Sequence, residues 1–255
     1  MNSQAGSSWT VGTGDAESML AEARKAFFVM VGFLAILWIV QLANVADSYH
    51  LVDEFGIRPR SITSLPDILT APFVHLSWTH IEANSGPLFI FGFLAAYRGV
   101  VRFLGLTALV IVGSGLAAWA TAPTNTVGVG ASGVVFGYLG YILVRGLFDR
   151  HVIDIIIGAV MALCFAYQFT VLLPHAGVGW QDHIGGLVAG VLGGWIFRER
   201  RRADRTARVP AATPAGSVTP ATDLAVKPAA PARGGTGQYG GPRGDLHKEL
   251  DDLGI

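Results

Sequence analysis

Residues 103–144 read FLGLTALVIVGSGLAAWATAPTNTVGVGASGVVFGYLGYILV and contain no charged side chain. A membrane-spanning helix needs about 20 predominantly apolar residues, so this stretch is long enough for two crossings. Residues 26–46 and 155–181 are also uncharged and of spanning length. The sequence therefore predicts an all-α membrane protein.

The composition of the whole chain supports this class. Of the 255 residues, 51% are hydrophobic and 14% are charged, and the mean hydropathy is +0.48. A soluble domain of this composition would expose long apolar runs. The formal net charge is zero and no nucleic-acid-binding motif is present, so we expect no nucleic-acid partner. A single cysteine, Cys164, excludes an intramolecular disulfide, and we expect neither a metal nor an organic cofactor.

Hydropathy interrupted by Arg, Pro and Gly predicts a polytopic bundle of six transmembrane helices. The expected spans are residues 26–46, 81–97, 103–121, 132–144, 153–173 and 183–197. Arginines follow the second, fourth and sixth spans, and the positive-inside rule makes that side cytoplasmic. We therefore expect a multi-pass protein of the cell membrane with both termini in the cytoplasm and the loop of residues 47–79 outside.

Three regions follow from this pattern. Residues 1–25 are expected to form a cytoplasmic N-terminal segment, and residues 26–197 the six-helix domain. Residues 198–255 begin with a run of arginines and continue in Ala, Pro, Gly and Thr, which predicts a basic and then disordered cytoplasmic tail. The arginine run is consistent with contact to anionic membrane lipid or with a plain topology signal.

Three polar residues fall at one depth on spans that run in the same direction. Asn84, Ser132 and His183 each precede by about 13 to 15 residues the arginine that ends their span, which is about 20–22 Å at 1.5 Å per residue. Polar groups inside a span are costly and are default candidates for function. A serine, a histidine and an amide at one level supply a nucleophile, a general base and an oxyanion donor.

Each of these residues also has a structural interpretation. Ser132 stands where a helix begins, so it is a candidate N-cap. His183 is a candidate for bonding a loop at the interface, and Asn84 for an interhelical hydrogen bond. Gly133-x-x-x-Gly137 and Gly186-x-x-x-Gly190 predict that the helices carrying Ser132 and His183 pack closely.

Four other polar residues are interpreted as structural. Ser114, among small residues, is typical of helix packing. Asp154 and Glu82 are expected at opposite membrane interfaces, because central burial of a charge is costly. Asp182 is next to His183, but neighbouring helical residues point about 100° apart, so we do not expect it to be a third catalytic member.

Three stretches, in chain order, resemble the signatures of rhomboid intramembrane proteases: HIEAN at 80–84, GASGVVFG at 130–137 and HIGGLVAG at 183–190. The resemblance covers roughly residues 26–197. The loop segments 56–60 and 69–77 are similar to those of the bacterial six-helix form.

This resemblance implies a role for each matching residue. Ser132 would be the nucleophile and His183 the base, without a required carboxylate, and His80 and Asn84 would face the oxyanion with the Ser132 N–H. The supporting residues would be Gly130, Gly133, Phe136, Gly186 and Gly190. Two positions depart from the family pattern, since Phe136 replaces a frequent tyrosine and Asp67 a frequent arginine.

The resemblance implies a serine endopeptidase that cleaves transmembrane segments of other membrane proteins. Residues 159–173 would correspond to the family's proposed substrate gate. One alternative is a catalytically inactive rhomboid-like protein that binds membrane clients. A second is a small transporter, although its polar residues would be expected at the midplane of broken helices.

Overall fold

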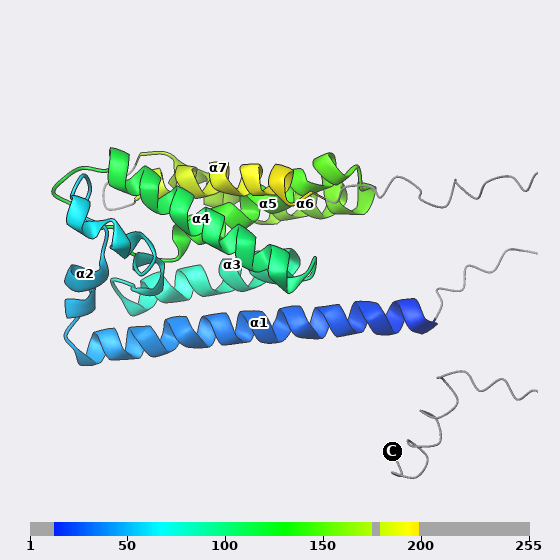
Figure 1. Ribbon diagram of the computed structural model, residues 1–255, viewed down its shortest axis with the longest axis horizontal. Coiled ribbons are helices and arrows are strands. Elements are labelled where there is room, and N and C mark those ends of the chain that lie inside the picture. Colours follow the sequence, from blue (N-terminus) through cyan, green and yellow to red (C-terminus); the bar gives the residue numbers. More distant parts are fainter. Residues whose placement is uncertain (1–12, 175–178, 199–255) are drawn as a thin grey trace, which may run out of the picture. The chain divides into compact units, whose positions relative to one another are not determined.

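The computed structural model describes residues 13–174 and 179–198, and its secondary structure in these ranges is helical apart from one isolated antiparallel bridge. The long helices are α1 (Thr13–Ala46), α3 (Trp78–Ala96), α4 (Val100–Thr121), α5 (Ser132–Asp149), α6 (Val152–Cys164) and α7 (Trp180–Ile196) (Figure 1). Short elements are α2 (His50–Phe55) and the 3₁₀ turns η1 (Ile62–Ser64), η2 (Pro66–Ile68), η3 (Ala71–Phe73) and η4 (Ala166–Leu172). The all-α class predicted from the sequence is confirmed.

Two of the described helices have the length and composition of a membrane span. These are residues 16–46 of α1 and the whole of α4. The pair α6 and η4 also qualifies if it is counted as one broken span, with a bend of 68° between its halves. The chain is therefore a helical membrane protein with at least two candidate spans.

The distribution of side chains is that of a protein in lipid. Large apolar residues such as Phe28 and Ile39 of α1 and Leu192 of α7 are exposed. Polar residues such as Asn84 and His183 are buried. Polar groups are expensive against hydrocarbon, so helices in a bilayer turn them toward the protein interior.

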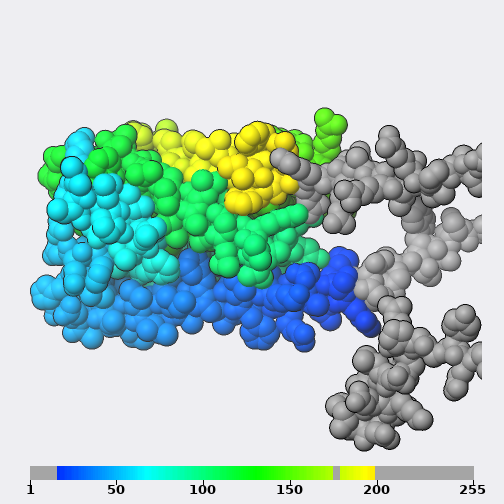
Figure 2. Space-filling view, in the orientation of Figure 1, coloured from blue at the N-terminus to red at the C-terminus, as the bar shows by residue number. Residues whose placement is uncertain are grey.

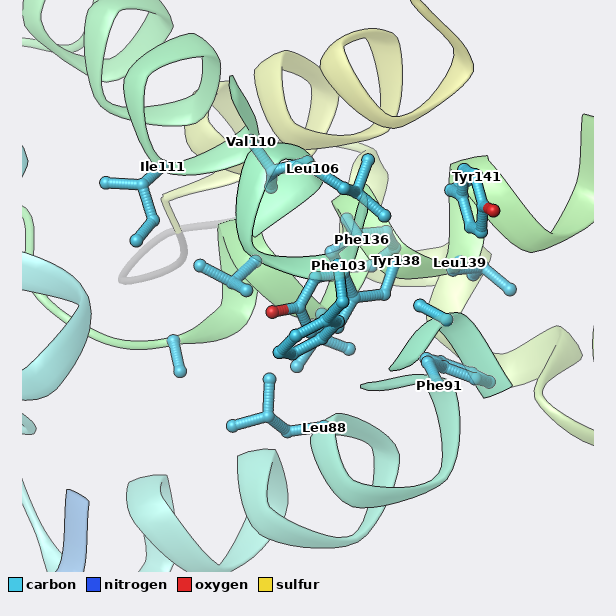
Figure 3. Close-up of a cluster of buried hydrophobic side chains, with 14 of the residues drawn as sticks. Leu88, Phe91, Phe103, Leu106, Val110, Ile111, Phe136, Tyr138, Leu139 and Tyr141 are labelled. Atoms are coloured by element: carbon cyan, nitrogen blue, oxygen red, sulfur yellow. The ribbon is translucent and has the colours of Figure 1, made fainter. Parts of the chain in front are cut away.

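Helix α5 lies at the centre of the packing. It buries most of its residues and contacts α3, α4, α6 and α7. Side chains from α3, α4 and α5 converge in one apolar cluster (Figure 3), which includes Leu88, Phe91, Phe103, Leu106, Val110, Phe136 and Tyr138. Because α5 is held on several sides, its first residue, Ser132, has a fixed position in the fold.

The loop between α1 and α3 is folded back on the start of α5. Ile57 and Gly128 exchange two backbone hydrogen bonds of 2.9 Å, and the indole of Trp119 donates to the Ser61 carbonyl at 2.8 Å. The α2 and η1–η3 region covers the end of the bundle where α1 terminates (Figures 1 and 2). This loop therefore supports the segment that leads into Ser132.

Several expected boundaries differ from the structure. Helix α1 begins at Thr13, within the segment expected to precede the first span. Helix α5 continues past residue 144 to Asp149, so Arg145 lies inside the helix, only 3% exposed. The fifth expected span is broken between α6 and η4. Residues 1–12 and the expected disordered tail from 199 onward lie outside the described residues.

Asp154 lies in the first turn of α6, and its side chain is buried within the protein. Its side chain is 4% exposed, accepts a hydrogen bond from Arg145 at 2.9 Å and forms an ion pair with Arg98. The Arg145 guanidinium also donates to the Leu94 carbonyl at 2.7 Å. Burial of this carboxylate is compensated by arginines from two other helical regions, which its position in the sequence did not indicate. Glu82 is exposed, as expected.

Candidate active site

Ser132 is the first residue of α5 and does not cap it. The N-cap position is occupied by Ala131, and the first hydrogen bond of the helix runs from Val135 N–H to the Ala131 carbonyl at 3.0 Å. The N–H groups of the first helical turn have no partner inside their own helix. The start of α5 therefore offers backbone donors next to a serine hydroxyl, and the N-cap interpretation of Ser132 is excluded.

The two residues before Ser132 are fixed by the outer loop. Gly130 N–H donates to the Ala71 carbonyl at 3.0 Å, and Ala131 N–H donates to Nε2 of His75 at 3.3 Å. Burial, reinforced by the nearby His80, lowers the pKa of His75 to about 3, so its ring is neutral and can accept this bond. The Asn44 amide in turn holds the His75 carbonyl at 2.9 Å. Sequence reasoning missed His75, whose only signal was a histidine in the loop five residues before His80.

Gly130 brings the backbone against the ring of His80. Its φ is +117°, a region that side chains rarely adopt, and a Cβ at this position would lie 2.7 Å from His80 Nε2. The Leu76 N–H donates to His80 Nδ1 at 3.4 Å, which leaves Nε2 as the protonated nitrogen. His80 therefore presents a side-chain donor beside the segment that enters α5.

Asn84 lies one helical turn after His80 on α3. Its side chain is buried, with 7% of the residue exposed, and Nδ2 has no hydrogen-bond partner among the described residues. A buried amide donor without a partner is costly unless another group uses it. Asn84 is thus available to donate to a bound oxygen.

The helices that carry Ser132 and His183 touch at their backbones. A Cβ on Gly186 would lie 2.0 Å from the Gly133 carbonyl oxygen, and one on Gly190 would lie 1.9 Å from that of Gly137. The predicted close approach of these helices is present. Side chains at either α7 position would force α5 and α7 apart and displace Ser132 relative to His183.

His183 is held on two sides. Its ring stacks on Phe136 with centroids 4.6 Å apart and an interplanar angle of 30°. Its Nδ1 lies 3.0 Å from the Val171 carbonyl of η4, which assigns the proton to Nδ1 and leaves Nε2 with a free lone pair. Sequence reasoning missed Val171, because a backbone carbonyl carries no residue-type signal.

The Ser132 hydroxyl bonds to Asp182 and not to His183. Ser132 Oγ donates to Asp182 Oδ2 at 3.2 Å, while the second oxygen of Asp182 lies 3.9 Å from His183 Nε2. Asp182, which we do not expect to be a third catalytic member, therefore contacts the Ser132 hydroxyl. Neighbouring helical side chains do diverge, but Ser132 approaches the first turn of α7 from the end of another helix, and its hydroxyl meets Asp182 there.

Ser114 lies close to this site but has a packing role. Its hydroxyl donates to the Ile111 carbonyl within α4 at 3.2 Å. A Cβ added to Gly133 would lie 2.7 Å from the Cβ of Ser114, so only glycine fits at position 133. The small residues of α4 thus allow α5 to lie close beside them.

Comparison with known proteins identifies the family. The model of the Rhomboid domain matches residues 63–200. "Uncharacterized protein Rv1337" of Mycobacterium tuberculosis (strain ATCC 25618 / H37Rv) is 35% identical over 184 residues, which cover 68% of this chain and 75% of that relative. "Rhomboid protease GlpG" of Haemophilus influenzae (strain ATCC 51907 / DSM 11121 / KW20 / Rd) is 25% identical over 190 residues, 73% of this chain and 97% of the relative. This chain therefore belongs to the rhomboid family.

Proposed function

We propose that this protein is an intramembrane serine endopeptidase that cleaves transmembrane segments of other membrane proteins. The observation that carries the proposal is the position of Ser132. It begins α5, where the N–H groups of the first turn have no partner within the helix, and its hydroxyl bonds to the first turn of α7, which also bears a histidine whose Nδ1 is held by Val171. A nucleophile, a base and oxyanion donors meeting at one point is the pattern of acyl transfer.

The proposal includes a topology in which the chain crosses the membrane six times. The longer helices α1, α3, α4, α5 and α7 and the broken pair α6 and η4 would each cross once, with both termini in the cytoplasm. The buried ion pairs of Asp154 with Arg98 and Arg145 join the end of α3, the end of α5 and the start of α6. Ser132 lies at the opposite end of α5, so the site would be near the outer face.

The chemistry would proceed in two acyl-transfer steps. Ser132 Oγ attacks the peptide carbonyl carbon while its proton passes to His183 Nε2, and the carbonyl π electrons move onto the oxygen. When the tetrahedral intermediate collapses, the C–N bond breaks and the leaving nitrogen takes the proton from His183. Water then repeats the sequence on the acyl-enzyme. Val171 would keep the base in the required tautomer throughout.

Three donors would stabilise the oxyanion: the N–H of Ser132, Nε2–H of His80 and Nδ2–H of Asn84. His80 lies against Gly130, and Asn84 is one turn farther along the same helix face. The unpaired Nδ2 of Asn84 fits this role, because a donor that is free in the resting protein gains its bond only when the negative charge develops.

The deciding experiment compares variants of the purified full chain in detergent. A fluorophosphonate should label Ser132, and a generic transmembrane-helix substrate should be cleaved. We expect Ser132→Ala to abolish both, and His183→Ala to lower turnover by at least about 10³-fold. Ser114→Ala is the matched control and should be labelled as the wild type is. Labelling that persists in Ser132→Ala would contradict the nucleophile assignment.

Asn84→Ala provides a further arm of this experiment. Loss of one oxyanion donor should lower kcat by about 10²–10³-fold while KM and the unfolding temperature change little. If Asn84 only links helices, the substitution should instead cost about 0.6–2 kcal/mol of stability and leave turnover per folded molecule unchanged.

A second candidate function is client binding without cleavage, and one observation favours it. In the resting structure the Ser132 hydroxyl is engaged by Asp182 and makes no hydrogen bond to His183. A folded wild-type protein that is neither labelled nor active, but that retains a transmembrane substrate in pull-down from detergent, would support this alternative.

A further inference from the structure

Asp182 lies between the proposed nucleophile and the proposed base. One carboxylate oxygen, Oδ2, accepts the Ser132 hydroxyl at 3.2 Å. The other, Oδ1, lies 3.9 Å from His183 Nε2 and has no hydrogen-bond partner among the described residues. The side chain is 21% exposed, so this carboxylate is largely shielded from solvent. A single group therefore reaches both reacting partners.

The position of Asp182 is set by the backbone rather than by its side chain alone. A Cβ on Gly133 would lie 3.2 Å from the Asp182 carbonyl oxygen, so α5 rests directly on this turn of α7. The first turn of α7 is also closed by Asp182 N–H bonding to the Gly179 carbonyl at 3.2 Å. The carboxylate thus has a defined place relative to Ser132 Oγ.

The arrangement differs from a Ser-His-Asp triad. In a triad the carboxylate binds Nδ1 of the histidine and fixes its tautomer. Here Nδ1 is taken by the Val171 carbonyl, and the carboxylate is on the Nε2 side, where the serine proton must arrive. The ionisable groups facing His183 are Asp182 of its own helix and His80 of α3. Among these, Asp182 is the group that can carry negative charge.

We infer that Asp182 is a further catalytic residue of this site: it holds the Ser132 hydroxyl in the resting protein, and after that hydroxyl has turned from Oδ2 to His183 Nε2 it stabilises the imidazolium formed when the serine proton is transferred. This inference rests on the proposed protease function. During attack the Ser132 O–H bond breaks and the Oγ–C bond forms, and the proton goes to His183 Nε2. The Asp182 carboxylate takes no proton and keeps its negative charge. It attracts the new positive charge across a short, partly desolvated distance.

The test uses the full chain in detergent, with a fluorophosphonate as probe and a generic transmembrane-helix substrate. Asp182→Asn keeps an acceptor oxygen and the side-chain size but removes the charge, whereas Asp182→Ala removes both. We expect both variants to lower kcat and the labelling rate constant of Ser132 by about 10- to 100-fold per folded molecule. KM and the unfolding temperature should stay close to wild type. Asp182→Glu restores the charge and should recover part of the rate.

Glu82→Gln is the matched control, because it removes an exposed carboxylate from α3 and should leave all rates unchanged. Wild-type rates in Asp182→Asn would overturn the inference, because they would show that the charge is not used. Faster labelling in Asp182→Ala would also overturn it, by showing that Asp182 restrains the serine. A wild-type chain that is not labelled at Ser132 would overturn the protease proposal and this inference together. Equal labelling of wild type and Asp182→Asn would overturn only the inference.

Discussion

Glycines bring α5 close to both α7 and α6, but the two contacts differ in how much of the neighbouring helix they bury. Against α7, glycines bring the backbones together, with a Cβ on Gly190 only 1.9 Å from the Gly137 carbonyl oxygen. Helix α6 buries only Asp154 and Gly158, and exposes large apolar residues such as Ile153 and Leu163. The α5–α7 contact is therefore the more extensive of the two, whereas α6 meets the α5 backbone closely at Asp154–Ile155, against Gly146, and at Gly158.

This difference separates the part of the molecule that would hold the proposed chemistry from the part beside it. Ser132 and His183 stand on α5 and α7, whose backbones touch at Gly186 and Gly190. The bent continuation of α6, the η4 turn, is attached by the Phe91–Phe165 ring contact at 4.8 Å and by the Val171 bond to His183. A displacement of η4 would therefore break the hydrogen bond that orients the base. The η4 turn is therefore joined to the α5–α7 pair through the His183 ring, in addition to the Phe91–Phe165 contact with α3.

The largest loss of stability is expected at the start of α6, where Asp154 is buried. Asp154→Asn leaves the buried Arg145 without its carboxylate, and breaking one side of a buried ion pair costs about 3–5 kcal/mol. We expect a marked fall in the unfolding temperature in detergent, with α6 the first element to gain hydrogen exchange. The matched control is Asp53→Asn, which removes an exposed pair with Arg58. Similar stability of both variants would show that α6 does not depend on this anchor.

A smaller loss of stability is expected from a substitution at the interface between α5 and α7. Gly190→Ala inserts a methyl group against the Gly137 carbonyl, and overpacking of this kind costs about 1–3 kcal/mol. The unfolding temperature should fall, and labelling of Ser132 should fall with it because the nucleophile and the base move apart. Gly32→Ala is the control, since nothing lies within 4 Å of a Cβ at that exposed position of α1. A Gly190→Ala variant that retains wild-type stability and labelling would contradict the rigid-interface interpretation.

The smallest effect on stability and turnover is expected from a substitution at the bend between α6 and η4. Phe165→Ala removes the edge-to-face contact with Phe91, which contributes about 0.5–1.5 kcal/mol. Loosening η4 should weaken the Val171 bond to His183, so kcat should fall by less than about 10-fold while KM stays unchanged. Measurement of kcat and KM for the transmembrane substrate at two temperatures would test this expectation. A rise in kcat would indicate instead that η4 limits substrate entry more than it orients the base.

Much of the site could be predicted from the sequence because it depends on residue type and spacing. The order of HIEAN, GASG and HIGG indicated the family, and the glycine spacings indicated that two helices would touch. No comparable signal marks His75 or Val171 in the sequence, since one is a loop histidine and the other bonds through its backbone carbonyl. The contact of Asp182 with Ser132 could not be predicted either, because adjacent positions on an ideal helix say nothing about a side chain arriving from another helix.

The sequence by itself determined that this chain is a helical membrane protein of the rhomboid family, because long apolar runs and local motifs are properties of neighbouring residues. Only the tertiary structure decided that Asp154 is buried between Arg98 and Arg145, and that the Ser132 hydroxyl donates to Asp182 and not to His183. Each of these contacts joins residues from different helical segments of the chain. The rotation and depth of each helix set such contacts, and both are fixed by close packing of many side chains at once.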